Sequence, residues 1–175
     1  MINLGTKELK SQRLILRKFK LDDFDELFNS YINQEEFLYY ANKNKKSIDE
    51  VKSMISIIKD SYSNDTYYNW LIVRQEDNKI VGAINLKHED ADTLLISYAI
   101  DARYANNGYM SEAVNRVKSY CLDELKVRKL VGLCCIENLA SKRVMEKCGF
   151  ALKPTEKKIV LKDGVHDAYE FVIEE

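Results

Sequence analysis

The spacing of apolar residues predicts two helices in the first third of the chain. Carboxylates at positions 22 and 23 can cap a helix start, and apolar residues then recur at three- and four-residue spacing from Phe24 to Tyr31. A second helix is predicted after Ser47, because Ser47 and Glu50 form a capping-box pattern ahead of an apolar face that runs to Ile58. The short apolar stretch 14–19, flanked by arginines, is expected to form the first strand.

The middle of the chain changes to the pattern of β-strands. Segments 67–74, 79–86 and 93–100 are rich in apolar, aromatic and β-branched residues. They are separated by turn residues at Asp77-Asn78 and by the polar run 89–92. Because consecutive strands joined by short turns pair antiparallel, we expect a β-meander here.

A second change of period follows residue 109. Apolar residues from Met110 to Cys121 share one face of a helix of about four turns. The remaining elements are expected to be a buried strand over 129–136, a helix over 138–147 ended by Gly149, and two strands over 150–161 and 166–173. The order β, α, α, β, β, β, α, β, α, β, β predicts an α/β (α+β) fold. Its central sheet should be mixed, with about seven strands and about four flanking helices.

Length and composition favour a single globular domain over residues 1–175. The chain is 46% hydrophobic and 31% charged, and it has no long uncharged apolar run that would predict a transmembrane helix. Its first 20 residues are too charged for the apolar part of a secretory signal. The net charge of −1 gives no general attraction for nucleic acid or an anionic membrane. We therefore expect a cytoplasmic protein with neither of these as a partner.

The cysteines give no sign of a metal site or a disulfide framework. They are Cys121, Cys134, Cys135 and Cys148, with no C-x-x-C pair and no histidine at a companion spacing. Cys134 and Cys135 are neighbours in an expected strand and should point to opposite faces. We expect reduced cysteines that act as small core residues, which suits a reducing cytoplasm.

The segment 103–110 joins an expected strand to an expected helix and has the composition of an anion site. A helix start presents N–H groups without partners inside the helix, at the positive end of the dipole. Gly108 allows close backbone approach, and Asn106 and Asn107 tolerate positive φ. Arg103 adds a positive charge that can pair with a phosphate. A turn of this composition by itself is more often structural than ligand-binding.

The turn and its flanks resemble the cofactor motif of the GNAT acetyltransferase superfamily, R/Q-x-x-G-x-G/A. Arg103 and Gly108 match its first and last fixed positions, whereas Asn106 stands where the family usually has a glycine. The preceding strand reads I-S-Y-A-I at 96–100 and is similar to the family's I-G-Y-W-I. The continuation G-Y-M-S-E-A at 108–113 resembles the family's G-Y-x-x-E-A.

Three further segments resemble the RimJ/RimL branch of this superfamily, which includes ribosomal-protein N-terminal acetyltransferases. Residues 138–150 read N-L-A-S-K-R-V-M-E-K-C-G-F, similar to the branch's N-x-x-S-x-x-V-x-E-K-x-G-F. Residues 12–17 read Q-R-L-I-L-R, similar to E-R-L-x-L-R, and K-I-V-G-A-I-N-L at 79–86 also resembles the branch. The resemblance covers nearly the whole chain, with its motifs in the family's order.

The resemblance implies that acetyl-CoA lies between two splayed parallel strands, here 93–100 and 129–136. It implies that the pantetheine arm pairs with the backbone of Tyr98, Ala99 and Ile100. The N–H groups that would cradle the pyrophosphate belong to Ala105, Asn106, Asn107, Gly108, Tyr109 and Met110. We expect Asn106 to adopt the left-handed helical region, which asparagine tolerates, so that cofactor binding survives the loss of the family glycine.

The start of the last predicted helix completes the implied cofactor site. Asn138 would bond the pantetheine or the acetyl region, and it would also serve as an N-cap. Arg143 would reach the cofactor's phosphates or simply lie exposed on its helix, and for Lys142 the exposed position is favoured. Ser141 is the candidate acid, since the family's usual tyrosine acid falls at Met145, although an ordinary first-turn serine explains Ser141 almost as well.

The resemblance also implies direct attack of a neutral amine on the thioester, without an acyl-enzyme. Many family members carry a glutamate base at the position of Leu95, so that base is missing. Glu89 is a weak candidate base acting through water, as are the adjacent Asp90 and His88, although solvated turn residues explain all three. Glu112 is another candidate, but the helix dipole accounts for a carboxylate in a first turn.

The missing base bears on the acceptor. At pH 7 an α-amino group is roughly 10–15% neutral, whereas a lysine-type amine is only about 0.04% neutral. The favoured acceptor is therefore the N-terminal α-amine of a protein or peptide. A small amine, such as a polyamine or an aminoglycoside, is the alternative within the same chemistry. A CoA-binding module that no longer catalyses is the alternative outside it, and a homodimer is compatible with the branch.

The acceptor site is expected between the first strand, the meander and the final strand pair. An aromatic set there forms a slot or, more usually, core packing: Phe37, Leu38, Tyr39, Tyr40, Tyr67, Tyr68 and Trp70. A set of acidic residues attracts a polycationic acceptor or simply occupies helix starts: Asp22, Asp23, Asp25, Glu26, Glu35 and Glu36.

Overall fold

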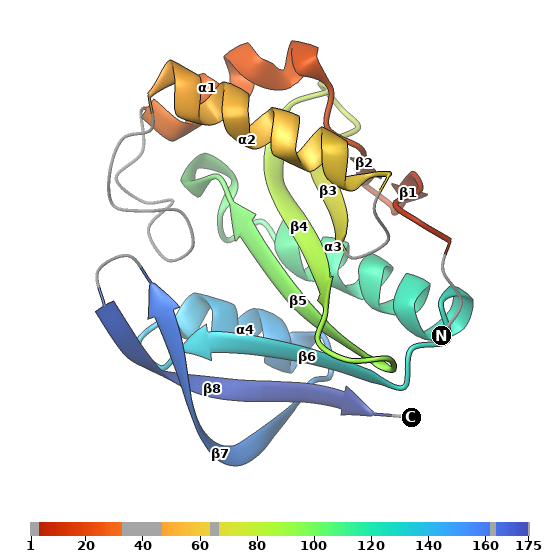
Figure 1. Cartoon of the computed structure of the whole chain (residues 1–175), viewed down its shortest axis with the longest axis vertical. Coiled ribbons are helices and arrows are strands. Elements are labelled where there is room, and N and C mark those ends of the chain that lie inside the picture. Colours follow the sequence, from red (N-terminus) through yellow and green to blue (C-terminus); the bar gives the residue numbers. More distant parts are fainter. Residues whose placement is uncertain (1–3, 33–46, 64–66, 162–163, 175) are drawn as a thin grey trace.

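The computed structural model describes residues 4–32, 47–63, 67–161 and 164–174 (Figure 1). The described strands are β1 (Leu9–Lys10), β2 (Leu14–Arg17), β3 (Tyr67–Arg74), β4 (Ile80–His88), β5 (Thr93–Ile100), β6 (Lys129–Cys135), β7 (Ala151–Leu161) and β8 (Gly164–Glu174). The described α-helices are α1 (Phe24–Ile32), α2 (Ile48–Ser61), α3 (Tyr109–Ser119) and α4 (Leu139–Lys147). Short helical turns occupy Leu21–Asp23, Ala102–Tyr104 and Tyr120–Glu124.

All these strands belong to one sheet in the order β1-β2-β3-β4-β5-β6-β8-β7. Neighbouring strands are antiparallel except β5 and β6, which are parallel. The mixed, mostly antiparallel sheet predicted from the order of elements is confirmed. The strand that the sequence pattern missed is β1, whose residue Leu9 pairs with Leu16 of β2. Two residues are too few to show a periodic pattern, so only the pairing partner reveals this strand.

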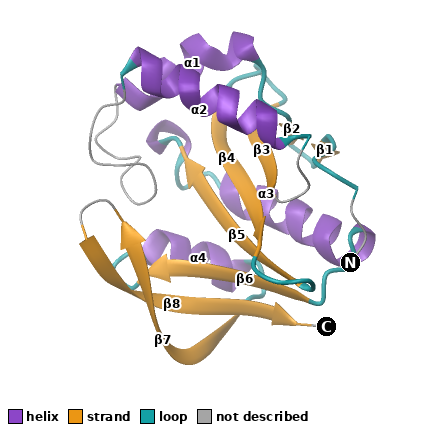
Figure 2. Ribbon diagram, in the orientation of Figure 1, coloured by secondary structure: helices purple, strands orange, loops and turns teal. Residues whose placement is uncertain are grey.

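Helices cover both faces of the sheet (Figure 2). The helices α1 and α2 pack against the face that carries Leu71 and Val73 of β3, and Val51 and Ile55 of α2 are fully buried there. The helices α3 and α4 pack on the opposite face, against Trp70 and the other residues that alternate with Leu71. The buried residues on this second face include Leu14, Leu16, Tyr68, Trp70, Ile84, Leu94, Ile96, Val114, Val117, Leu130 and Phe171.

The helix ends follow the capping signals in the sequence. The hydroxyl of Ser47 accepts from the N–H of Glu50 at 3.2 Å, and the Glu50 carboxylate accepts from the N–H of Ser47 at 2.7 Å. The predicted capping box is thus confirmed. Gly149 follows α4 with φ of 80°, as expected of a C-terminal glycine. In the described residues, none of the helices combines the length and apolar character needed to span a membrane.

The four cysteines are buried and reduced, as the sequence predicted. Cys134 lies in the core under α3 and α4, while Cys135, its neighbour on β6, points to the other face. Burial raises the pKa of the Cys121 thiol to about 12 and that of the Cys148 thiol to about 11. These thiols therefore stay protonated at neutral pH and act as apolar core groups.

Candidate functional site

The sheet opens between β5 and β6. These strands pair in parallel only from Thr93 opposite Lys129 to Ile96 opposite Gly132. Beyond this point β5 follows β4 as far as Ile100, while β6 follows β8, so the two strands spread apart (Figure 1). The splayed parallel pair inferred from the resemblance is therefore present. The backbone of 98–100 lies on one arm of the opening, and the last residues of β6 lie on the other.

The turn after β5 has the backbone conformation of an anion site. Asn106 has φ of 62° and Gly108, the N-cap of α3, has φ of 78°. The prediction that Asn106 adopts the left-handed helical region is confirmed. The Nδ2 group of Asn107 donates to the carbonyl oxygens of Tyr104 and Ala105 at 3.2 and 2.9 Å. The turn is thus held by its own side chain, and it leads directly into the first N–H groups of α3.

Arg13, the residue before β2, braces this turn. Its Nη1 donates to the carbonyl oxygen of Asn107 at 3.1 Å, and its guanidinium lies 4.5 Å from the ring centroid of Tyr109. Its Nε donates to Glu112 at 2.7 Å. The Glu112 carboxylate also accepts from the backbone N–H of Arg13 and the hydroxyl of Ser11, each at 2.7 Å. No sequence pattern indicates this bracing role, because Arg13 and Glu112 are far apart in the chain.

The bracing contacts explain the charge state of Glu112. Partial burial would raise the pKa of this carboxyl, but the hydrogen bonds from Arg13 and Ser11 outweigh it and lower the pKa below its ordinary value. A carboxylate committed to three hydrogen bonds is a poor proton acceptor. These contacts account for Glu112 as a structural residue of the turn, and a role for it as a base stays a prediction.

Arg103 folds back onto Asp101 at the end of β5. Its Nη2 lies 2.6 Å from Oδ2 of Asp101, and its Nε lies 3.0 Å from Oδ1. The Asp101 side chain is 2% exposed, whereas that of Arg103 is 58% exposed. The hydrogen bond with Asp101 raises the pKa of Arg103. Arg103 thus anchors the turn to the strand, and its pairing with a cofactor phosphate stays a prediction.

Two hydroxyl groups meet at the opening. The Tyr98 hydroxyl on β5 lies 2.9 Å from Oγ of Ser141 and donates to the Ser141 carbonyl oxygen at 3.2 Å. Asn138 caps α4, since its Oδ1 accepts from the N–H of Ser141 at 3.0 Å. Burial raises the pKa of the adjacent Cys134 thiol to about 11, and a hydrogen bond from Ser141 opposes this rise. The sequence pointed to the backbone of Tyr98 and missed its hydroxyl.

The position of the family's tyrosine acid is filled here by an apolar residue of the core. Met145 of α4 is 1% exposed and packs over Gly132, the last residue of β6 that pairs with β5. A Cβ on Gly132 would lie 2.2 Å from Cε of Met145. Met145 therefore fills the space above the point of divergence as a core residue. The Tyr98–Ser141 pair is therefore the candidate proton donor at the opening.

The candidate base Glu89 is not brought to the opening. Because β4 and β5 are antiparallel, the turn after β4 lies beside the start of β5, and His88 pairs with Leu94. The exposed Glu89 donates its backbone N–H to the carbonyl oxygen of Thr93 at 3.0 Å in this turn. The turn therefore sits at the paired end of β5, away from Tyr98 and the segment 103–110. Direct contact of Glu89, Asp90 or His88 with the opening is excluded by this register.

Four of the proposed acceptor-side residues have structural roles. Tyr68 and Trp70 are 1% and 0% exposed under α3, so they form core and not an aromatic slot, whereas Tyr67 is 41% exposed. The Asp23 carboxylate accepts from the Arg17 guanidinium at 2.7 and 2.8 Å, and Glu26 accepts from the N–H of Ile80 at 2.8 Å. The candidates Glu35, Glu36, Phe37, Leu38, Tyr39 and Tyr40 lie outside the described residues.

The two basic residues of α4 differ in their surroundings. The Lys142 ammonium lies 4.9 Å from the ring centroid of Tyr169 and 3.9 Å from Oε1 of Glu146. Arg143 is exposed on the helix. Lys142 thus has contacts that explain it without a cofactor, as the sequence favoured. A phosphate contact of Arg143 stays a prediction.

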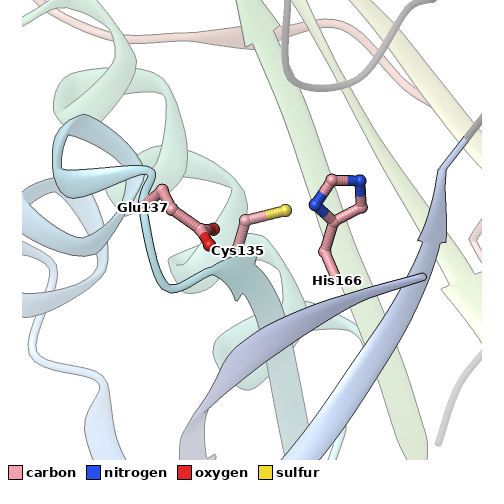
Figure 3. A group of neighbouring side chains, drawn as sticks. All are labelled: Cys135, Glu137 and His166. Atoms are coloured by element: carbon pink, nitrogen blue, oxygen red, sulfur yellow. The ribbon is translucent and has the colours of Figure 1, made fainter. Parts of the chain in front are cut away.

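A cluster that the sequence spacing did not suggest lies at the end of β6. The ligand atoms of Cys135, Glu137 and His166 all lie within 4.8 Å of one another (Figure 3). His166 comes from β8, about thirty residues further along the chain, so no local pattern signals this set. Along the sequence, no histidine lies at a metal-ligand spacing from the cysteines. In the folded chain, Cys135 has one.

Comparison with known protein families identifies the class to which this fold and site belong. A family profile described as "Acetyltransferase (GNAT) domain" matches residues 13–151. The chain therefore belongs to the GNAT family and is an N-acetyltransferase that uses acetyl-CoA. The matched range includes Arg13, the turn 103–110 and the start of α4.

Individual relatives support this assignment. The chain is 29% identical over 161 residues to the uncharacterized N-acetyltransferase YoaA of Bacillus subtilis (strain 168), covering 89% of each protein. The crystal structure of a GNAT-family acetyltransferase from Bacillus anthracis matches with a TM-score of 0.82 and 25% identity, covering 96% of this chain and 98% of that one. RimL, the ribosomal L7/L12 alpha-N-protein acetyltransferase in complex with coenzyme A, shares the fold with a TM-score of 0.82 at 17% identity, covering 96% of this chain and 98% of that one.

Proposed function

We propose that this chain transfers the acetyl group of acetyl-CoA to the N-terminal α-amine of a protein or peptide. The observation that carries the proposal is the neutral hydroxyl pair of Tyr98 and Ser141, 2.9 Å apart, at the opening between β5 and β6. Leu95 occupies the β5 position at which many GNAT enzymes hold a glutamate base. The site therefore offers a proton to the leaving group, and its β5 position holds no glutamate to take a proton from the acceptor.

The residues of the turn fit the cofactor. Asn106 and Gly108 both have positive φ, which lets successive N–H groups from Asn106 to Met110 face one anion. Ala105, expected to belong to this set, instead donates its N–H to the carbonyl oxygen of Ala102 at 3.1 Å. The start of α3 adds the positive end of a helix dipole. We propose that these N–H groups hold the pyrophosphate, that the backbone of 98–100 pairs with the pantetheine arm, and that Asn138 contacts it from α4. When bound, acetyl-CoA supplies the acetyl group as a reactive thioester.

The hydroxyl pair is suited to a modest proton-transfer role. Ser141 is 7% exposed, and its Oγ contacts Tyr98 on the opposite arm of the opening. A thiol has a pKa of about 8.5, so a thiolate leaving group needs little help at pH 7. Ser141 holds a proton at Oγ that it can give to the leaving sulfur, and Tyr98 can replace it. The proton that the amine loses on forming the amide restores Tyr98, so both hydroxyls are neutral before and after the reaction. Ser141 is thus the proposed acid, with Tyr98 as its partner.

The acceptor follows from the missing base. An α-amine loses its proton to water at a pH close to neutrality, whereas a lysine-type amine near pKa 10.4 needs a base in the site. RimL, which shares this fold, acts on the α-amine of ribosomal protein L7/L12. That function fits a site whose hydroxyl pair serves the leaving group alone. Reduced, buried cysteines fit a cytoplasmic place of action.

A thiol-release assay with acetyl-CoA tests this function. Two acceptors are compared. The first is a peptide with a free α-amine and no lysine, and the second has the same sequence with one lysine introduced and its N-terminus blocked. We expect release with the first peptide only, at a rate that rises with pH up to about 8. Mass spectrometry should place the acetyl group on the terminal nitrogen.

The other candidate functions give different results in the same assay. Preferred acetylation of spermine or an aminoglycoside would contradict the peptide acceptor and identify a small-amine enzyme. Binding of acetyl-CoA by calorimetry, with no thiol release for any acceptor, would identify a CoA-binding module. No binding of acetyl-CoA at millimolar concentration would contradict the role proposed for the turn.

A further inference from the structure

The strand register brings a thiol, a carboxylate and an imidazole to one point beside the opening. Cys135 pairs with Ala168, and the N–H of Ile136 donates to the carbonyl oxygen of Asp167 at 3.1 Å. Beyond Cys135 the chain leaves the strand, and the N–H of Asn138 donates to the carbonyl oxygen of Cys135 at 2.9 Å. This turn keeps Glu137 close to Cys135, while the pairing of β6 with β8 brings His166 beside the end of β6. The strand pairing and the turn together therefore create the cluster.

The side chains of the cluster converge. The Sγ atom of Cys135, a carboxylate oxygen of Glu137 and an imidazole nitrogen of His166 all lie within 4.8 Å of one another. Figure 3 shows the Cys135 sulfur pointing toward the imidazole ring, with the Glu137 carboxylate beside the cysteine. Cys135 is 3% exposed, His166 is partly exposed and Glu137 is exposed. The buried thiol thus has a route from solvent along its two partners.

We propose that Cys135, Glu137 and His166 bind one Zn²⁺ ion. Thiolate, imidazole and carboxylate are the three ligand types that Zn²⁺ takes in proteins, at about 2.0–2.3 Å. Ligands of a tetrahedral ion at those distances are about 3.5 Å apart, so small side-chain rotations from the described positions bring the three atoms to the ion. Three protein ligands leave a fourth position for water, as in open zinc sites.

The ligand set also selects against other ions. Mg²⁺ and Ca²⁺ take oxygen ligands, which a thiol and an imidazole do not supply. On binding, the Cys135 proton is released to solvent and the thiolate coordinates the ion. The site lies at the end of β6, on the face opposite Cys134 and the α3 and α4 helices. It shares no residue with the proposed cofactor site, so it stands whether or not the acceptor is an α-amine.

Cobalt binding to the metal-free, tag-free full chain tests the proposal. Co²⁺ replaces Zn²⁺ in such sites and reports a bound thiolate by a sulfur-to-cobalt charge-transfer band in the near ultraviolet. We expect this band to saturate at one equivalent of Co²⁺ and to be abolished when one equivalent of Zn²⁺ is added. Calorimetry with Zn²⁺ should give the same stoichiometry.

The chain offers a matched control for each key ligand. It contains two histidines, so His166→Gln removes a proposed ligand while His88→Gln removes the other histidine. Likewise Cys135→Ser changes a ligand, while Cys134→Ser changes its neighbour on the opposite face of β6. We expect His166→Gln and Cys135→Ser to weaken Zn²⁺ binding by more than about 100-fold, because even loss of an outer-shell partner costs about 10–100-fold. Both controls should bind as the wild type does.

Several results would overturn the proposal. The first is the absence of a charge-transfer band when the wild-type protein is mixed with excess Co²⁺. The second is Zn²⁺ binding that His166→Gln leaves unchanged. Weakening by the control His88→Gln to the same extent would also overturn it. His166 is partly exposed, so its glutamine variant should stay folded, and an unchanged circular dichroism melt verifies that a loss of binding comes from the lost ligand.

Discussion

The two places where helices meet the opening are built from different chemistry. At the start of α3, charged groups hold the turn: Arg13 pairs with Glu112 at 2.7 Å, and Arg103 pairs with Asp101 at 2.6 Å. At the start of α4, neutral groups make the contacts, with Tyr98 2.9 Å from Ser141. The charged contacts lie behind the turn and fix its shape, which leaves its N–H groups to an anion. The neutral pair can pass a proton to the leaving sulfur and become neutral again by taking the proton that the attacking amine releases. Under the proposed function, the start of α3 binds the cofactor and the start of α4 takes part in the reaction.

Gly82→Ala should have the largest effect, because it disturbs the strand that both ends share. A Cβ on Gly82 would lie 2.4 Å from the carbonyl oxygen of Ala99 on β5. This neighbour is backbone and cannot rotate away, so β4 and β5 must separate where the pantetheine arm is expected. We expect a loss of about 3 kcal/mol in the free energy of unfolding, measured with urea, and weaker acetyl-CoA binding. An unchanged urea midpoint would show that the strands separate there without cost.

Glu112→Gln should damage the binding end and spare the reacting end. We expect the free energy of unfolding at pH 7 to fall by about 1–2 kcal/mol, because charged hydrogen bonds to Arg13 and Ser11 are lost. The pKa of Glu112 is lowered in the folded protein, so its stabilisation is complete above the ordinary value of 4.5. It disappears as the pH falls through the lowered value.

The measurement for Glu112 is a pair of urea titrations, at pH 7 and in acid. The difference between wild type and Glu112→Gln should be present at neutral pH and vanish in acid. Glu146→Gln is the control, since Glu146 makes an exposed pair with Lys142 at 3.9 Å and should change stability little. A difference between wild type and Glu112→Gln that grows on acidification would contradict the assigned role.

Ser141→Ala should damage the reacting end and spare the binding end. We expect kcat to fall by about two- to tenfold, with little change in the affinity for acetyl-CoA, because a thiol needs little help to leave at pH 7. Tyr98→Phe should behave alike, and the double variant should be no slower than either single one if the hydroxyls act as a unit. An unchanged kcat at saturating acceptor would remove Ser141 from the mechanism.

Asn106→Gly should have the smallest effect. Asn106 already has φ of 62°, a region that asparagine adopts, so the family glycine would relieve little strain. We expect stability and acetyl-CoA affinity within about 0.5 kcal/mol of the wild type. Calorimetry with acetyl-CoA checks this, and a large gain in affinity would show that the asparagine strains the turn.

Patterns within single segments determined most of the fold. Apolar spacing and caps located every described α-helix, and the capping box at Ser47 was visible in four consecutive residues. The turn residues Asn106 and Gly108 and the Asn138 cap were also local signals, because their conformations depend on near neighbours. The sequence patterns missed strand β1, because two residues show no periodicity and only their pairing with β2 reveals them.

The sequence by itself thus determined the elements, the family and the cofactor, since each depends on residues close together along the chain. The tertiary structure alone decided which distant side chains share a site. It joined Arg13 to Glu112 and the hydroxyl of Tyr98 to Ser141, and it brought His166 to Cys135. It also removed Glu89 from the opening, because the antiparallel register of β4 and β5 puts that turn at the far end of the strand. The physical reason is that strand register and helix packing fix distances that spacing along a chain does not contain.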